Sequence, residues 1–93
     1  MAFDWIGNRL KHFLATSRDG LVCSIRAGID RDDSSNLYKD IEVELDTTDK
    51  TISISELFTP ENRSTLVLAR EDYDNDDSWI NDACNKLTNK AFT

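Results

Sequence analysis

The first apolar positions of the chain recur every three or four residues, which is the period of an amphipathic helix. On a helix over residues 3–14, five apolar side chains fall within an arc of about 100°. These side chains are Phe3, Ile6, Leu10, Phe13 and Leu14. Asp4 and Lys11 lie on the opposite side, and Asp19 with Gly20 forms a stop and turn signal. The pattern therefore predicts an opening helix that packs one face against a core.

From residue 21 to residue 29 the period changes to two, as in a half-buried strand. The side chains predicted to point inward are Leu21, Cys23, Ile25, Ala27 and Ile29. Those predicted to point outward are Val22, Ser24 and Arg26. Residues 30–37 are polar and rich in loop formers, so we expect a connection there.

The same alternation returns twice after this connection. Ile41, Val43 and Leu45 alternate with Glu42 and Glu44, which predicts a second strand with an acidic outer face. Residues 46–50 suit a hairpin loop. The strand after it is predicted to turn two isoleucines inward and two serines outward: Ile52, Ile54, Ser53 and Ser55. Strands two and three are therefore expected to form an antiparallel hairpin.

Residues 65–69 are apolar on both faces, which is typical of a strand that is central or covered on both sides. A turn at 59–63 around the single proline precedes it. A second helix is predicted to begin near Ser78, with an Asp82–Lys86 pair at i,i+4. Its apolar arc comprises Trp79, Ile80, Ala83, Cys84, Leu87 and Ala91.

These elements predict one α+β domain over residues 1–93. The order is α-β-β-β-β-α, with a four-stranded antiparallel sheet and two helices on one face. The predicted core residues are Phe3, Ile6, Leu10, Phe13, Ile25, Val43, Ile54, Leu66, Ile80 and Leu87.

The net charge of the chain limits the classes of partner that the protein is expected to bind. Eighteen acidic and eleven basic residues give a net charge of −7, which disfavours direct binding to nucleic acid or to an anionic membrane. No run of apolar residues approaches the roughly 18 needed to span a bilayer, and no signal-peptide pattern appears. We therefore expect a cytoplasmic monomer in which Cys23 and Cys84 remain thiols.

The acidic segment at 71–77 invites comparison with a calcium-binding loop. Asp72, Asp74 and Asp76 fit its first, third and fifth positions, but Asp77 occupies the glycine position and Ala83 the bidentate position. Capping of the second helix by Asp76 or Asp77 is the stronger interpretation. No metal or cofactor is predicted.

The sequence favours a protein without catalytic activity. His12 is the only imidazole, and it lies off the apolar stripe of the first helix. A Cys23–His12 pair would need Cys23 to turn away from the core, and no nucleophile motif such as G-x-S-x-G is present. The three glycines are isolated, so no phosphate-binding loop is expected.

Trp5 and Arg9 form the first candidate binding feature. On the helical wheel Trp5 lies about 80° beyond the edge of the apolar stripe, beside Arg9 and His12. Aromatic and arginine side chains together on a surface are typical interface anchors. Alternatively, Trp5 covers the edge of the sheet or the frayed start of the helix.

The second candidate feature is an uneven distribution of charge. Residues 1–31 carry a net charge of +2 and residues 32–93 a net charge of −9. The candidate partner-binding carboxylates are Glu42, Glu44, Glu71, Asp72, Asp74, Asp76 and Asp77. Such carboxylates on a rigid scaffold can imitate a phosphate backbone, although an acidic surface also serves solubility alone.

We therefore expect a non-catalytic acidic module that binds a basic surface on another protein. The expected action is that of an inhibitor or nucleic-acid mimic on the basic groove of a nucleic-acid-processing protein. In acidity and size the chain is similar, as a class, to phage or mobile-element inhibitors and toxin-immunity proteins, although no motif supports this. The alternative is a small accessory or structural subunit that docks through Trp5 and an apolar sheet face.

Overall fold

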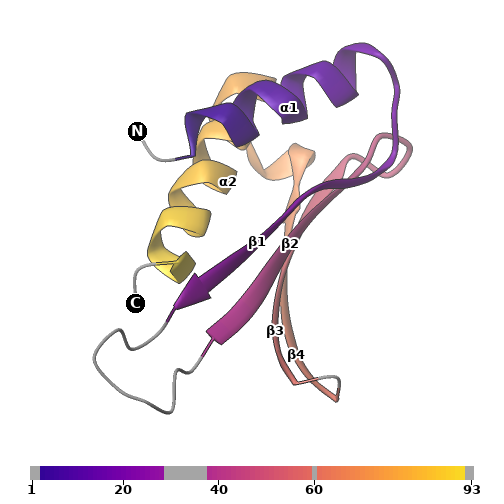
Figure 1. Cartoon of the computed structure of the whole chain (residues 1–93). Helices are drawn as coiled ribbons and strands as arrows, with labels where there is room; N and C mark the ends of the chain where they lie inside the picture. Colours follow the sequence, from indigo (N-terminus) through magenta and orange to yellow (C-terminus); the bar gives the residue numbers. More distant parts are fainter. Residues whose placement is uncertain (1–2, 29–37, 60, 92–93) are drawn as a thin grey trace.

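The computed structural model describes residues 3–28, 38–59 and 61–91. Its elements in chain order are α1 (Asp4–Ala15), β1 (Gly20–Gly28), β2 (Tyr38–Asp46), β3 (Thr51–Thr59), β4 (Asn62–Ala69), the 3-10 turn η1 (Arg70–Asp72) and α2 (Asp76–Ala91). The strands form one antiparallel sheet in the order β1-β2-β3-β4, and both helices cover the same face of it (Figure 1). The predicted α-β-β-β-β-α fold is confirmed. The predictions for Ile29, for the 30–37 connection and for Pro60 fall outside the described residues.

The core lies between the helix layer and the inner face of the sheet. Its buried apolar residues are Ile6, Leu10, Phe13, Val22, Cys23, Ala27, Ile41, Val43, Leu45, Ile52, Ile54, Leu68, Trp79, Ile80, Ala83 and Leu87. Trp79 is fully buried, and its indole Nε1 donates a hydrogen bond of 3.0 Å to the carbonyl of Leu68. Phe3, Ile25 and Leu66, which were predicted as core residues, are partly buried and pack against this cluster.

The two helices approach closely at Gly7. A Cβ atom at this position would lie 3.2 Å from Cys84 Sγ and 3.5 Å from a methyl group of Ile80. Cys84 Sγ also lies 3.6 Å from the carbonyl oxygen of Phe3, to which it donates a weak hydrogen bond. The first and last helices of the chain therefore pack directly on each other, and the absence of a side chain at Gly7 permits that distance.

The start of β1 differs from the predicted alternation. The pairing with β2 shifts between Leu21 and Cys23, so Val22 is an extra residue in a β-bulge. Val22 is 1% exposed, whereas Leu21 is 50% exposed and faces away from the helices beside Glu44. The prediction of Leu21 inward and Val22 outward was wrong, because the bulge reverses the alternation before Cys23.

The burial predicted for residues 65–69 on both faces was also wrong. β4 pairs only with β3 among the described strands and forms an edge of the sheet. Leu68 points inward and is buried, but Val67 is 54% exposed on the face opposite the helices. Residues 65–69 of β4 are therefore apolar on both faces of the sheet, although only the face toward the helices is covered.

The second helix begins two residues earlier than predicted, and its cap is Asn75 rather than Asp76 or Asp77. Asn75 Oδ1 accepts hydrogen bonds from the backbone N–H of Ser78 at 2.8 Å and from its hydroxyl at 3.0 Å. The predicted Asp82–Lys86 pair is present at 3.9 Å. In the described ranges, neither helix is long and apolar enough to cross a membrane.

Candidate functional site: the outer face of the sheet

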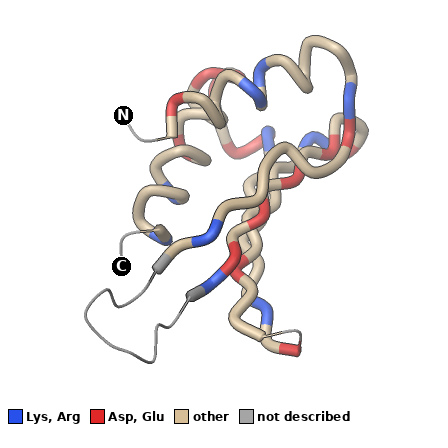
Figure 2. The backbone as a smooth tube through the Cα atoms, in the orientation of Figure 1, with Lys and Arg blue, Asp and Glu red and all other residues tan. Residues whose placement is uncertain are grey.

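Four carboxylates line the face of β2 that points away from the helices. Alternation along the strand turns Ile41, Val43 and Leu45 into the core, so the residues between and beside them point outward. The outward group, called the carboxylate column below, comprises Asp40, Glu42, Glu44 and Asp46. Acidic positions recur along β2 in Figure 2. Successive members lie about 7 Å apart, because a strand rises about 3.3 Å per residue.

The neighbours of the column are short. Cross-strand pairing places Ser24 and Ser55 on either side of Glu42, and Ser53 beside Glu44. Ser55 in turn hydrogen bonds to the Thr65 hydroxyl at 3.1 Å. These small side chains leave the longer glutamates projecting from the face.

Two apolar side chains flank the column at the level of Glu44. The pairing runs Leu21–Glu44–Ser53–Val67 across the four strands. Leu21 and Val67 are 50% and 54% exposed, respectively, and are among the most exposed large apolar residues described. The face thus combines a central line of negative charge with an apolar side chain on each side.

The negative charges of the two central carboxylates of the column, Glu42 and Glu44, are not balanced by a described cation. Asp40 pairs with Arg26 at 3.3 Å, and Asp46 Oδ1 accepts the backbone N–H groups of Thr48 and Asp49, both at 2.9 Å. Within the described ranges, Glu42 and Glu44 form no ion pair or hydrogen bond through their side chains. At about 7 Å their mutual repulsion is about 0.6 kcal/mol in water and about 2 kcal/mol at an effective permittivity of 20. This arrangement opposes folding rather than supporting it.

A shallow hollow of about 330 Å³ opens at one end of the column. Its lining includes the carboxylates of Asp19, Glu44 and Asp46. Asp19 accepts hydrogen bonds from the hydroxyl and the backbone N–H of Thr47, and these bonds lower the pKa of Asp19 below its usual value. The hollow therefore remains acidic and has room for a cationic side chain.

The predicted carboxylates of 71–77 lie apart from the column, between β4 and α2. Asp76 pairs with Arg70 at 2.6 Å, and Asp77 lies 3.9 Å from Lys11 of α1. Glu71, Asp72 and Asp74 are exposed. Within the described ranges, no group of three or more His, Cys, Asp or Glu residues is arranged to hold a metal ion. The structure therefore separates the seven predicted carboxylates into two regions.

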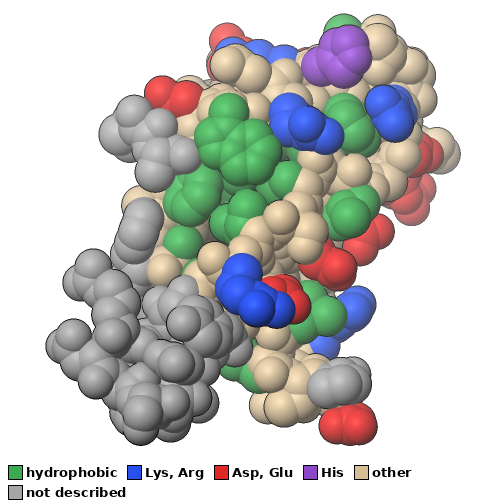
Figure 3. All heavy atoms as spheres, viewed as in Figure 1, with side chains coloured by type: hydrophobic (Ala, Val, Ile, Leu, Met, Phe, Trp, Pro, Cys, Tyr) green, Lys and Arg blue, Asp and Glu red, His purple; other side chains and the backbone are tan. Residues whose placement is uncertain are grey.

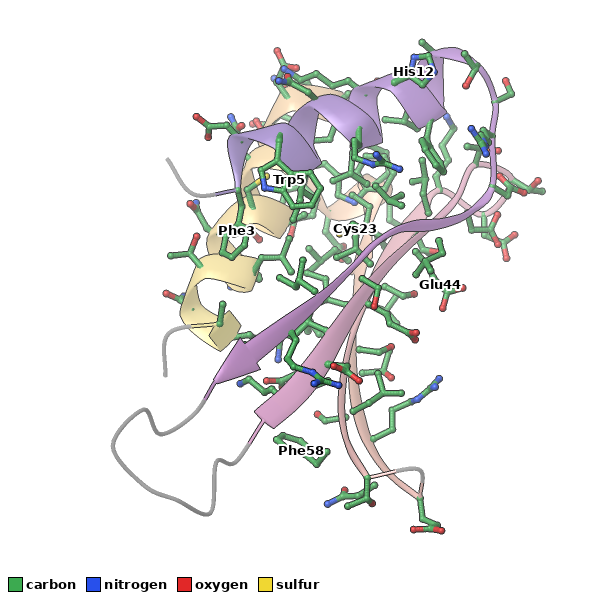
Figure 4. All side chains as sticks on the ribbon, viewed as in Figure 1. Phe3, Trp5, His12, Cys23, Glu44 and Phe58 are labelled. Atoms are coloured by element: carbon green, nitrogen blue, oxygen red, sulfur yellow. The ribbon has the colours of Figure 1, made fainter. Side chains whose placement is uncertain are left out.

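Trp5 and Arg9 occupy a third region, on the helix layer. Trp5 is 46% exposed. Its side chain projects from α1 above β1, whereas Glu44 projects from the opposite side of the sheet (Figure 4). The predicted binding residues consequently do not form one continuous site.

The thiols of Cys23 and Cys84 are not activated in this arrangement. Burial, the largest cause, raises the pKa of the Cys23 thiol to about 11, so the thiol is protonated at neutral pH. Burial also raises the pKa of Cys84. His12 lies at the far end of α1 and points away from Cys23 (Figure 4). Both cysteines are free thiols in the structure.

Two further polar interactions were not predicted from the sequence. Tyr73 donates a hydrogen bond of 2.6 Å to Asp82, which raises the pKa of Tyr73 to about 12. Lys39 and Glu56 form a buried ion pair at 2.7 Å, which Lys90 of α2 joins at 3.0 Å. Alternation did contain a signal for this pair, because Lys39 and Glu56 fall at inward positions next to Ile41 and Ile54.

Compared with known protein families, curated proteins and solved structures, the chain shows no significant match to any of them.

Proposed function

We propose that this protein is a non-catalytic acidic binding module whose outer sheet face docks on a basic groove of another protein. The class of partner that best fits is a nucleic-acid-processing protein inside the cell, because such a groove is built to accept regularly spaced negative charges. The module would then act as an inhibitor or nucleic-acid mimic, as phage counter-defence and immunity-like proteins do.

The observation that supports this proposal is the uncompensated pair of Glu42 and Glu44 in the middle of the carboxylate column. Their repulsion costs stability, and no described cation offsets it. The pair lies on β2, which is held between β1 and β3, so the spacing of the charges is fixed by the backbone. A basic groove would relieve the repulsion upon binding.

Apolar contacts on the same face would add affinity. Individual exposed ion pairs contribute only about 0–1 kcal/mol, so charge alone gives weak binding. Leu21 and Val67 flank the column and would lose their exposed apolar surface to a partner. They provide the anchor that sequence analysis had assigned to Trp5.

The acidic residues of 71–77 have a lesser role in this proposal. Glu71, Asp72 and Asp74 add to the negative field that attracts a basic partner from a distance. Asp76 and Asp77 already have partners in Arg70 and Lys11. We expect these five residues to affect the association rate more than the dissociation rate.

The test is capture of nucleic-acid-processing proteins on the immobilised module, with short duplex DNA as competitor. Wild type is compared with Glu42→Lys/Glu44→Lys and with Glu42→Gln/Glu44→Gln. We expect DNA to displace the captured protein, the glutamine pair to weaken capture, and the lysine pair to abolish it. A Glu71→Lys/Asp74→Lys variant measures the contribution of the 71–77 segment.

The matched control is Asp4→Lys/Glu61→Lys, which makes the same change in charge at two exposed sites away from the column. The control should bind almost as wild type does at 150 mM salt, where the screening length is about 8 Å. Equal capture by the wild type and the Glu42→Lys/Glu44→Lys variant would contradict the proposal.

The alternative of an accessory subunit requires an open apolar sheet face. The apolar inner face is covered by α1 and α2, and the open face carries the carboxylate column. Trp5 remains exposed in this fold, and the proposed function does not use it.

A further inference from the structure

The edge of β1 forms a second surface, distinct from the outer sheet face. β2 is the only strand that pairs with β1 in the described part of the chain, so one side of the β1 backbone lacks a strand partner. α1 and β1 run in roughly opposite directions, with α1 above this edge (Figure 1). No strand among the described residues covers this edge, which lies below a helix.

The bulge and Arg9 block the first half of this edge. Arg9 Nε donates a hydrogen bond of 2.9 Å to the carbonyl of Val22, the bulged residue. Bulges and charged side chains are the means by which proteins protect exposed strand edges. The half over residues 24–27 has no such protection among the described residues.

An apolar patch lies above the unprotected half. Trp5 is one turn of α1 before Arg9, and because α1 and β1 run in opposite directions, that turn lies over the later residues of β1. Trp5 and Phe3 both project on this side of the molecule (Figure 4), and Ile25 of β1 is only partly buried. Figure 3 shows apolar side chains gathered on this face, with basic and acidic side chains at the margin.

One cation on this side, Arg9, has no charged partner among the described residues. Its terminal nitrogens have no described partner either. Arg26, on the outward side of the same half of β1, has a 69% exposed side chain although it contacts Asp40. Asp4 instead lies on the α2 side of α1, where it lines a hollow with Gly7 and Cys84.

We propose that this surface, made of Trp5, Arg9 and β1 residues 24–27, binds an extended acidic segment of a partner protein by strand addition. The open backbone selects an extended chain. Trp5 and Ile25 contact its inward apolar side chains, and Arg9 pairs with a carboxylate. A second copy of the chain fits poorly, because pairing two β1 edges would bring two Arg9 and two Arg26 side chains together.

The probe for this surface is an end-blocked seven-residue peptide that alternates glutamate with valine. Two peptides serve as controls: one with lysine in place of glutamate, and one N-methylated along a single backbone edge. Binding is measured by Trp5 fluorescence, since Trp79 is fully buried and Trp5 is 46% exposed, and by backbone amide NMR shifts.

We expect the glutamate peptide to shift the Trp5 emission to shorter wavelength and to move the amide signals of residues 24–27. Trp5→Ala and Arg9→Glu should each weaken binding about tenfold, which corresponds to about 1.4 kcal/mol. Glu42→Gln/Glu44→Gln should leave it within about threefold. Glu42 and Glu44 are the centre of the proposed function and lie on the outer sheet face, whereas the peptide is expected at the β1 edge. A negative result for peptide binding therefore leaves the proposed function of the outer face untouched, and the reverse also holds.

Three results would overturn the inference. One is that the wild-type protein shows no emission or amide shift with the glutamate peptide at millimolar concentration, or that the Trp5→Ala and Arg9→Glu variants, shown to be folded by circular dichroism, bind it as wild type does. Another is equal binding of the lysine or the N-methylated peptide. The third is dimerisation in sedimentation experiments that Arg9→Glu abolishes, since it would assign the edge to a second copy of the chain.

Discussion

At the scale of single residues, one carboxylate ties three elements together. Glu56 of β3 accepts hydrogen bonds from Lys39 of β2 at 2.7 Å and from Lys90 of α2 at 3.0 Å. Burial by itself raises the pKa of Glu56, but the hydrogen bonds and charges of the two lysines together lower it below its ordinary value. The carboxylate is therefore ionised in the folded protein, and it holds the end of α2 on the sheet.

The first prediction concerns this cluster. Glu56→Gln leaves Lys39 buried without its counter-charge, so we expect a loss of about 3–5 kcal/mol in the free energy of unfolding at pH 7. Because the folded-state pKa is lowered, the contribution is present above the ordinary pKa near 4.5 and is lost as the pH falls below it. Urea unfolding from pH 7 to pH 3 should show wild type and variant converging. Glu61→Gln, at an exposed position, is the control.

The second prediction concerns the core. Leu10 is fully buried, so Leu10→Ala should cost about 2–5 kcal/mol in urea unfolding. Leu66 was expected from sequence to cost as much, but it is only partly buried, so Leu66→Ala should cost less. Val67→Ala, at 54% exposure, should change stability by less than about 0.5 kcal/mol. Similar losses for all three variants would show that the inner face is assigned incorrectly.

At the scale of elements, the residue that caps α2 is difficult to identify from the sequence, because several acidic residues near it could also cap a helix. Four aspartates surround Asn75 in residues 72–77, and sequence analysis favoured Asp76 or Asp77 as the cap. The structure places Asn75 just before the helix, with its side chain bonded to Ser78. The aspartates that follow lie in the first turn, where they complement the helix dipole.

The third prediction follows from that cap. Asn75→Ala removes the acceptor for the backbone N–H of Ser78, and we expect a loss of about 1 kcal/mol. Asn75→Asp should retain most of the stability, because aspartate also caps helices well. The thermal unfolding midpoint measures both effects. A larger loss in Asp74→Ala than in Asn75→Ala would contradict the assignment.

The elements themselves could be predicted because their periodicity is local. Both helices and all four strands follow from spacing within short segments, and so does the outward position of Glu42 and Glu44. The bulge at Val22 could not be predicted, since it depends on pairing with β2. The exposure of Val67 depends on which face the helices cover. The separation of Trp5 from the carboxylate column is likewise a property of the assembled layers.

At the scale of the whole molecule, net charge and its placement act against folding. The chain carries a net charge of −7, and its central carboxylates lie on one face with little compensation. Self-repulsion of this kind destabilises a compact state and is weakened by salt.

The fourth prediction is that added salt stabilises the protein. Raising NaCl from 50 mM to 500 mM should raise the unfolding midpoint of wild type, since the repulsion between carboxylates is screened. Glu42→Gln/Glu44→Gln should be more stable than wild type at low salt and respond less to added salt. Asp4→Asn/Glu61→Gln controls for the loss of two charges elsewhere. A destabilised glutamine pair would show that the column supports the fold, which would remove the argument for its function.

The contact between Phe3 and Cys84 has a consequence for biosynthesis. These residues are 81 positions apart, so the helix layer is assembled from segments that are far apart in the sequence. During translation all four strands are made before α2, so the surface that Trp79, Ile80 and Leu87 cover is buried only after α2 has been made. At about 5–20 residues per second, the 16 residues of α2 take roughly one to three seconds to synthesise. Until α2 has been made and has folded onto the sheet, any sheet that forms leaves part of its apolar inner face in contact with water.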